Sequence, residues 1–192
     1  MMKQQPLKID FYDRPTLEVA RDLIGCTLVR QIESRVLMAR VIETEAYIGE
    51  GDKACHASKG MTSRTKVMFG RPGTAYVYLI YGMYHCLNFV TERECFPAAV
   101  LIRGLQPVAG FDAPLKNLSP AKKRMFLNGP GRLCRALEIT REHNGLDVTR
   151  AGALFVMPRE TDPGTIIQTP RIGVDYAGDD ALLPWRFVSP SF

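Results

Sequence analysis

The sequence predicts an α+β fold in which short strands outnumber helices. Most apolar residues fall in short runs that are typical of strands, and only a few segments show helical spacing. The length of 192 residues suits one hydrophobic core, and the hydrophobic content of 46% is ordinary for a globular protein. Because no repeat, low-complexity tract or linker divides the chain, we expect a single domain over residues 1–192.

The N-terminal part predicts one helix followed by a β-hairpin. Residues 15–23 begin with proline and carry apolar residues at helical spacing, and Gly25 is well placed to end the helix. Residues 26–32 and 36–44 are strand-like, and the short segment 33–35 between them predicts a hairpin.

The segment VIETEAY, residues 41–47, is the main candidate for chemistry. Alternate side chains of a strand share a face, so one face would carry Val41, Glu43, Glu45 and Tyr47. Glu45 and Tyr47 would lie roughly 6.6 Å apart along the chain, at about 3.3 Å per residue. A carboxylate that can activate water would then stand beside a ring on which a planar group can stack. The alternative is a solvated strand face, with the glutamates paired with nearby lysines and the tyrosine packed at the edge.

A polar segment and a second hairpin follow. Residues 48–73 lack periodicity, and a long loop inside a compact domain is usually functional or disordered; its position directly after the carboxylate favours a function. Residues 74–80 and 84–91 predict two strands with Tyr81 at the tip between them, and residues 98–105 predict a third strand.

The tyrosines around this hairpin have two explanations. Aromatic residues favour sheets, so all four tyrosines could simply pack there, and we adopt this explanation for Tyr76 and Tyr84. Tyr81 comes beside a glycine where the alternation breaks, which fits a wedge pushed between stacked bases.

The C-terminal half predicts two helices and three short strands. Ser119 and Pro120 are the capping and first residues expected of a helix. A longer helix is expected over residues 132–142, with Gly145 just beyond its end. The late strands are expected at residues 154–157, 166–172 and 185–188.

Several other polar residues could take part in a site. His56, one of three histidines, lies in the polar loop, where a purely structural role is the alternative. Asn88 falls inside a predicted strand and needs a partner if it is buried. Arg103 falls in an apolar strand and should meet a carboxylate or a phosphate. A solvated helix face or a phosphate-binding edge could explain the cationic stretch Lys122, Lys123, Arg124, Arg132 and Arg135.

The net charge of +5 fits a nucleic-acid partner, although many basic proteins bind none. No stretch approaches 18 consecutive apolar residues, and the first residues lack an apolar signal core. We therefore expect no membrane span and a location in the cytosol or a nucleus.

Five cysteines without a CxxC motif argue against a disulfide framework and a zinc knuckle. The adjacent pairs Cys55-His56 and His85-Cys86 could supply one metal ligand each, which makes two where four are usual. We expect neither a metal nor another cofactor.

Six regions together resemble the alkyladenine (3-methyladenine) DNA glycosylases found in mammals and many bacteria. They are VIETEAY at 41–47, DKACHA at 52–57, SRTKVMF with RPGTAYVYLIYGMYHCLN within 63–88, AVLIRGLQP at 99–107, NGPGRLCRAL at 128–137, and PRIGVDYA with PWRF within 170–187. They follow the family's order over nearly the whole chain, and the first four are highly specific. Residues 144–164 do not align with the family pattern.

The resemblance implies a compact domain with a curved antiparallel sheet, flanking helices and a protruding β-hairpin. It implies that Glu45 is the general base, that Tyr81 intercalates into DNA and that Arg103 supports the site near the DNA. The pocket for a flipped base would be lined by Tyr47, His56, Tyr78, Asn88, Ile172 and Gly173, with Asn88 restricting which purines fit. Within the SRTKVMF segment, we expect Arg64 and Lys66 to bind DNA.

The implied activity is that of a monofunctional DNA N-glycosylase that starts base-excision repair. It would remove alkylated purines, chiefly 3-methyladenine and also hypoxanthine, from double-stranded DNA as a cytoplasmic monomer, associated with the nucleoid in a bacterium. No lysine is placed for a Schiff base, so we expect no lyase activity. Two alternatives are a DNA-damage sensor that flips bases without cutting and a hydrolase of free nucleosides or nucleotides.

Overall fold

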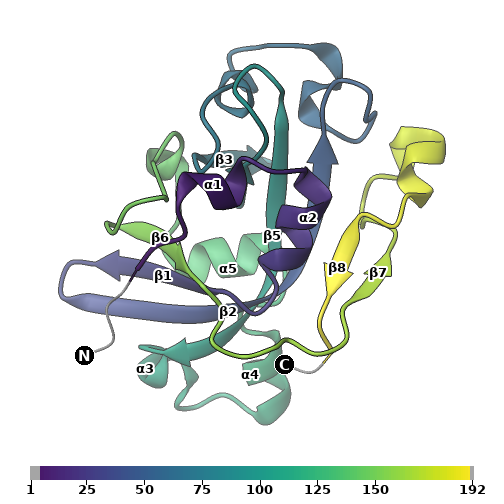
Figure 1. Ribbon diagram of the computed structural model, residues 1–192. Helices are drawn as coiled ribbons and strands as arrows, with labels where there is room; N and C mark the ends of the chain where they lie inside the picture. Colours follow the sequence, from purple (N-terminus) through teal and green to yellow (C-terminus); the bar gives the residue numbers. More distant parts are fainter. Residues whose placement is uncertain (1–4, 191–192) are drawn as a thin grey trace.

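The computed structural model describes residues 5–190, and its centre is an antiparallel sheet (Figure 1). The main path through the sheet is β3-β4-β5-β2-β1-β6, while β8 pairs with both β2 and β7. Within these residues the strands are β1 (Thr27–Ile32), β2 (Arg35–Ile48), β3 (Ala75–Ile80), β4 (Tyr84–Val90), β5 (Ala98–Ala109), β6 (Leu154–Met157), β7 (Ile167–Thr169) and β8 (Arg186–Val188). The prediction of an α+β fold with an antiparallel sheet is confirmed.

Short helices flank this sheet. The α-helices are α1 (Ile9–Tyr12), α2 (Thr16–Asp22), α3 (Asp112–Leu115), α4 (Pro120–Met125) and α5 (Pro130–Ala136). The 3₁₀ helices are η1 (His56–Lys59), η2 (Lys66–Phe69), η3 (Arg141–His143) and η4 (Asp175–Leu182). Among residues 5–190, no helix is long and apolar enough to cross a membrane.

Helix α2 confirms the prediction for residues 15–23 and packs on the sheet. Val19, Ala20 and Leu23 are completely buried, which for a side chain the size of leucine contributes about 1.5–3 kcal/mol. The hydroxyl of Thr44 on β2 donates a 2.8 Å hydrogen bond to the carbonyl of Ala20, so the helix is tied to the strand beneath it.

Strand β2 has hydrogen-bonded neighbours on both sides. It forms the predicted hairpin with β1, pairs with β5 along most of its length, and pairs with β8 at Glu43, Thr44 and Glu45. A strand in the middle of a sheet cannot shift without breaking both ladders. The candidate catalytic segment therefore lies on a rigid part of the fold.

The predicted face of the VIETEAY segment is wrong at its first residue. The register with β5 shifts between Val41 and Glu43 and again between Glu43 and Thr44. Val41 consequently packs in the same hydrophobic core as Ala46, although strict alternation would place these two residues on opposite faces. Val41 does not share a face with Glu45, because the irregular pairing turns the strand between them.

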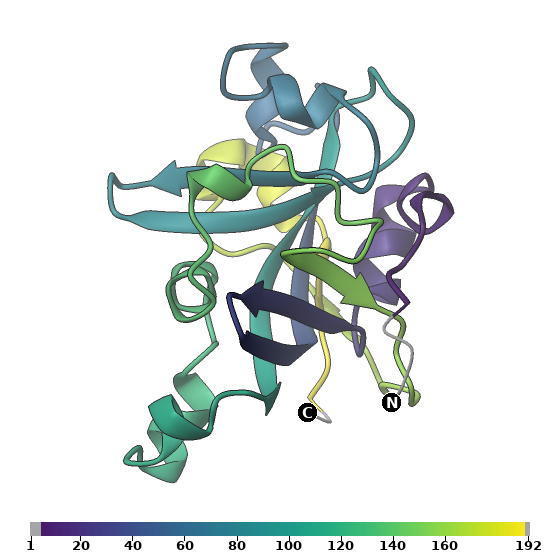
Figure 2. The same ribbon diagram turned by 90° about the vertical axis from the view of Figure 1, so that its left-hand side faces the viewer.

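The predicted hairpin at residues 74–91 is confirmed as β3 and β4, and it protrudes from the body of the protein (Figure 2). The amide of Met83 donates to the carbonyl of Ile80 and closes the tip. Tyr81 and Gly82 between them have φ values of 53° and 70°. Glycine accepts this left-handed conformation readily, whereas tyrosine adopts it at a cost.

Two helical regions differ from the prediction. The helix expected at residues 132–142 begins earlier and ends at Ala136, because Glu138 turns into the left-handed region with φ 51°. The turn brings the apolar Ile139 into the core, which a continuing helix would not allow. Residues 48–73, expected to be irregular, contain η1 and η2.

The other expected elements are close to prediction. Ser119 caps α4, accepting a hydrogen bond from the amide of Lys122. The predicted strand at 154–157 matches β6, whereas β7 covers only three of the residues expected at 166–172.

Candidate active site

The carboxylate of Glu45 lies at the centre of the candidate site and is completely buried. Its Oε1 accepts a 2.8 Å hydrogen bond from the backbone amide of Ile172, and its Oε2 accepts a 2.8 Å bond from the Tyr47 hydroxyl. The Arg103 guanidinium lies 3.4 Å from Oε1 and 3.5 Å from Oε2. The β2 strand thus supplies the carboxylate, and a segment more than 120 residues away along the chain completes its surroundings.

Burial raises the pKa of the Glu45 carboxyl above its ordinary value. The Arg103 cation, the Ile172 amide and the Tyr47 hydroxyl act in the opposite direction, because each favours the ionised form. A carboxylate with a raised pKa is a stronger base than an exposed glutamate. This is the property required of a group that must accept a proton from water.

Glu43 lies beside Glu45 and is bound by two arginines. Its Oε1 accepts from Arg186 Nε at 2.6 Å and from Arg103 Nε at 3.1 Å. These partners are arginines and the carboxylates are buried, so the solvated face with lysine pairs is wrong. Of the two partners expected for Arg103, the structure places carboxylates next to it.

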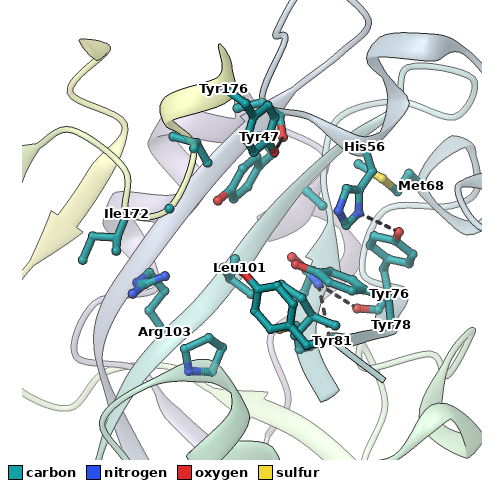
Figure 3. Close-up of a pocket in the computed structure, with 18 residues that line it drawn as sticks. Tyr47, His56, Met68, Tyr76, Tyr78, Tyr81, Leu101, Arg103, Ile172 and Tyr176 are labelled. Atoms are coloured by element: carbon teal, nitrogen blue, oxygen red, sulfur yellow. Dashed lines mark hydrogen bonds between the residues drawn. The ribbon is translucent and has the colours of Figure 1, made fainter. Parts of the chain in front are cut away.

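A small cavity opens beside these groups, with aromatic side chains on two sides (Figure 3). Tyr47 lies on one side, and His56, Tyr76 and Tyr78 lie on the other. The cavity volume is about 180 Å³, below the roughly 300–1,000 Å³ typical of pockets for drug-sized ligands. Its size and its flat walls suit one planar ring system.

Two tyrosines fix the orientation of His56. Its Nδ1 lies 3.0 Å from the Tyr76 hydroxyl, and its ring meets the Tyr78 ring edge-on with centroids 4.5 Å apart. Burial, together with the nearby Arg64 cation, lowers the pKa of His56 to about 4. The imidazole is therefore neutral at physiological pH and does not repel a cation in the cavity.

The remaining predicted pocket residues also reach this cavity. Asn88, Ile172 and Gly173 all line it. The Asn88 side chain donates from Nδ2 to the carbonyl of Tyr76 at 3.0 Å and to that of Cys86 at 3.4 Å. Both bonds hold the amide in one orientation at the cavity wall.

The residues expected to contact DNA lie in three different environments. Tyr81 is 84% exposed at the hairpin tip and also lines the cavity. Arg64 stacks over the Tyr78 ring, with its guanidinium carbon 5.0 Å from the ring centroid. Lys66 is exposed on η2 and does not line the cavity. The cationic stretch on α4 and α5 is exposed, and its role stays a prediction.

Sequence reasoning missed several residues of the site. Tyr76, which we assigned to simple packing, binds His56 and lines the cavity; its position two residues before Tyr78 was the available signal. Tyr176 lines the opening and is 72% exposed, and Pro130 and Met68 also line the cavity. These last three residues lie within the SRTKVMF, NGPGRLCRAL and PRIGVDYA segments, but no pattern inside those segments singles them out, because their place at the cavity depends on how distant segments pack.

Metal ligands form no cluster in the structure. Among residues 5–190, no group of three or more histidine, cysteine, aspartate or glutamate side chains is arranged to hold a metal ion. Cys55 and Cys86 are buried, and the ring of His56 is already engaged by Tyr76.

The aromatic cavity and its carboxylate belong to a chain with well-defined relatives. A family model for methylpurine-DNA glycosylases matches residues 10–191, nearly the entire sequence. The chain belongs to the methylpurine-DNA glycosylase family. The resemblance drawn from the sequence motifs is therefore confirmed, and membership makes this protein a DNA glycosylase, an enzyme that binds DNA as its substrate.

Individual relatives support this assignment over comparable lengths. A protein of Methanocella arvoryzae is 60% identical over 182 residues, covering 93% of this chain and 89% of the relative. A protein of Alkaliphilus oremlandii is 45% identical over 190 residues, covering 94% of each chain. A protein of Myxococcus xanthus is 49% identical over 177 residues, covering 92% of this chain and 86% of the relative. Each carries 3-methyladenine DNA glycosylase as a provisional name.

Proposed function

We propose that this methylpurine-DNA glycosylase is a monofunctional enzyme that flips alkylated purines out of duplex DNA and hydrolyses their N-glycosidic bonds. The main substrate would be 3-methyladenine, with hypoxanthine as a second one. The observation that carries the proposal is the buried Glu45 carboxylate beside a cavity with aromatic walls on two sides. The names of the relatives point to the same substrate.

The cavity suits a flipped base for physical reasons. A base inside duplex DNA is out of reach of any side chain, so it must rotate into a pocket. Tyr47 on one side and His56 with Tyr78 on the other would hold it between flat surfaces. An alkylated adenine that carries positive charge gains from aromatic faces, and the neutral His56 does not oppose it.

Glu45 would act as the general base in hydrolysis. Its carboxylate takes a proton from water while the water oxygen bonds to the sugar carbon C1′ and the C1′–N bond breaks, its electron pair leaving with the purine. The same negative charge stabilises the oxocarbenium-like transition state. One carboxylate is enough because a cationic purine already leaves readily. No lysine lines the cavity among the described residues, which supports hydrolysis without a Schiff base.

The groups at the opening would engage the DNA. Tyr81 would enter the stack and fill the space left by the flipped nucleotide. Arg64, Lys66 and Arg103 would lie near the backbone, and the net charge of +5 favours the approach to DNA. We further propose that residues 1–192 form one domain, act as a monomer and work in the compartment that holds the chromosome. There the enzyme would start base-excision repair.

Single-turnover excision from duplexes that each carry one defined lesion tests the proposal. Release of 3-methyladenine from duplex DNA, faster than hypoxanthine and far faster than normal purines, is the expected result. Lesion binding without release would identify a damage sensor instead. Release from free nucleosides at equal rate, together with salt-independent behaviour, would identify a nucleoside hydrolase.

A further inference from the structure

A second buried ion pair lies near Glu45 and Tyr47 but does not line the cavity. Arg171 and Asp52 both have side chains with 0% exposure. The guanidinium donates twice to the carboxylate, at 2.6 Å to Oδ2 and at 2.8 Å to Oδ1. Neither residue is one that the proposed chemistry uses directly.

This pair joins three segments that carry the site. Arg171 donates to the carbonyl of Ala46, which lies between Glu45 and Tyr47 on β2. It also donates to the carbonyl of Asp180 on η4. Asp52 accepts from the amides of Ile48 and Ala54, and so shapes the turn that leads to η1 and His56. Loss of the pair would free these segments from one another.

Arg171 also contacts the Tyr47 ring and directly precedes Ile172, whose amide binds Glu45. Its guanidinium carbon lies 4.9 Å from the Tyr47 ring centroid, on the ring proposed to stack on the base. The centroid of the Trp185 ring lies 5.0 Å from the same guanidinium carbon. The next residue, Ile172, donates its amide to Glu45 at 2.8 Å. The Arg171 side chain therefore supports the Tyr47 ring and anchors the Ile172 amide that binds the Glu45 carboxylate.

The energetics of the pair favour a geometric role. Two fully buried charges lose their hydration, and an apolar pair of similar volume often gives equal or greater stability. In addition, the buried Arg171 Nε has no hydrogen-bond partner among the described residues. A buried ion pair at this position would therefore be a poor way to add stability alone.

We propose that Arg171, held by Asp52, is a positioning residue that aligns the Tyr47 ring and the Ile172 amide with Glu45 for excision. This inference rests on the proposed glycosylase function. A lysine at position 171 keeps the charge but lacks the planar fork that binds Asp52, Ala46 and Asp180 together. Since a misplacement of about 1 Å can cost on the order of 100-fold, Arg171→Lys should slow single-turnover excision by about 10- to 100-fold.

A control is available at Arg30 on β1, which is also buried but does not line the cavity. Arg30 donates to the carbonyls of Leu137 and Ala153, so Arg30→Lys also loses buried side-chain hydrogen bonds, although to carbonyl oxygens rather than to a carboxylate. It should lower the melting temperature without slowing excision. The single tryptophan, Trp185, reports the local change, because its fluorescence should respond to Arg171→Lys and not to Arg30→Lys.

The pH profile separates positioning from stability. The Ile172 amide lowers the pKa of Glu45, so a loosened amide should move the acid limb of the rate profile of Arg171→Lys to higher pH. If Arg171→Lys and Arg30→Lys have the same melting temperature, the same excision rate and the same acid limb, the positioning role is overturned. If Arg171→Lys does not fold, Asp52→Asn must show the same shift or the inference fails. A wild-type protein that excises nothing from the same duplex would instead overturn the proposed function.

Discussion

Glu45, the proposed general base, and Tyr81, at the hairpin tip, lie in opposite kinds of environment near one cavity, which Tyr81 lines and Glu45 does not. Glu45 is completely buried and contacts Tyr47, Arg103 and Ile172, whereas Tyr81 is 84% exposed and has a left-handed backbone. The buried carboxylate is fixed before any substrate arrives. The exposed Tyr81 ring gains its partners only from another molecule. Only such a partner would offset the free-energy cost of the left-handed backbone and of the exposed ring. Under the proposed function, this difference matches two tasks: catalysis, which needs preorganised groups, and DNA binding, which needs a side chain that extends from the surface.

Glu45→Gln should have the largest effect, because it keeps the shape of the side chain and removes the carboxylate proposed as the general base. We expect excision to fall by about 100- to 10,000-fold while lesion-DNA affinity stays near that of the wild type. The measurement is single-turnover excision together with duplex binding. Glu43→Gln is the matched control and should be much milder, because Glu43 has no proposed catalytic role and a glutamine oxygen can still accept from Arg103 and Arg186. A near wild-type rate for Glu45→Gln would reject the assignment.

The same substitution tests the burial of Glu45 through stability. Its folded-state pKa lies above the ordinary glutamate value, so the folded protein binds more protons than the unfolded chain in that window. Stability is thus present below the ordinary pKa and is lost as pH rises through the raised one. Glu45→Gln should remove this loss, so its melting temperature at neutral pH should equal or exceed that of the wild type.

Tyr81→Ser should act on binding and leave the fold intact. Without the ring, the unstacking cost of a few kcal/mol is not offset, so affinity for a lesion duplex should fall. Met83→Ser is the control, because Met83 is also exposed near the tip at 66% but does not line the cavity. Equal affinity of Tyr81→Ser and wild type would contradict the wedge. A collapse of the melting temperature would favour packing instead.

Asn88→Ser should change the choice of base. Guanine carries an exocyclic amine at position 2, and the Asn88 amide cannot move away because two carbonyls hold it. A clash or an unpaired polar group there costs about 1–3 kcal/mol, so Asn88→Ser should relax the rejection of guanine-type lesions. The measurement is the ratio of single-turnover rates for a guanine-derived and an adenine-derived lesion. Equal losses for both lesions, with lower stability, would mean that Asn88 only joins β3 and β4.

Tyr47→Phe should have the smallest effect and the sharpest signature. The Tyr47 hydroxyl donates to Glu45 and lowers its pKa, so its removal should move the acid limb of the excision profile to higher pH. The phenyl ring still stacks, and one lost hydrogen bond corresponds to about 0.5–1.5 kcal/mol. An acid limb that does not move would show that another group controls the profile.

The sequence predicts the local parts of this molecule better than the distant ones. The strand of Glu45 and the hairpin of Tyr81 follow from patterns within a few residues, and both are present. The shifts in register near Val41 and the end of α5 depend on packing against other elements, so alternation gave the wrong face for Val41 and helical spacing gave the wrong bounds for α5.

The candidate site shows the same limit. Motif resemblance drew attention to Glu45, Tyr47 and His56, which the structure brings to one cavity or its wall. Arg171 lies in the PRIGVDYA motif and Asp52 in the DKACHA motif, but their pairing escaped notice because 119 residues separate them. Contacts of that separation can be found only when the chain is folded.

The separation of the groups around Glu45 has a consequence for protein synthesis. The carboxylate is made early, but the Ile172 amide follows 127 residues later and Arg186, which holds the neighbouring Glu43, follows Glu43 by 143 residues. A domain generally folds as a unit, so folding is completed only after the ribosome has added the segments that the unit needs. A chain extended only through β7 therefore contains Glu45, the proposed base, without the Ile172 amide that binds it and without β8. Catalytic competence should appear abruptly, when β8 pairs with β2, rather than grow with chain length.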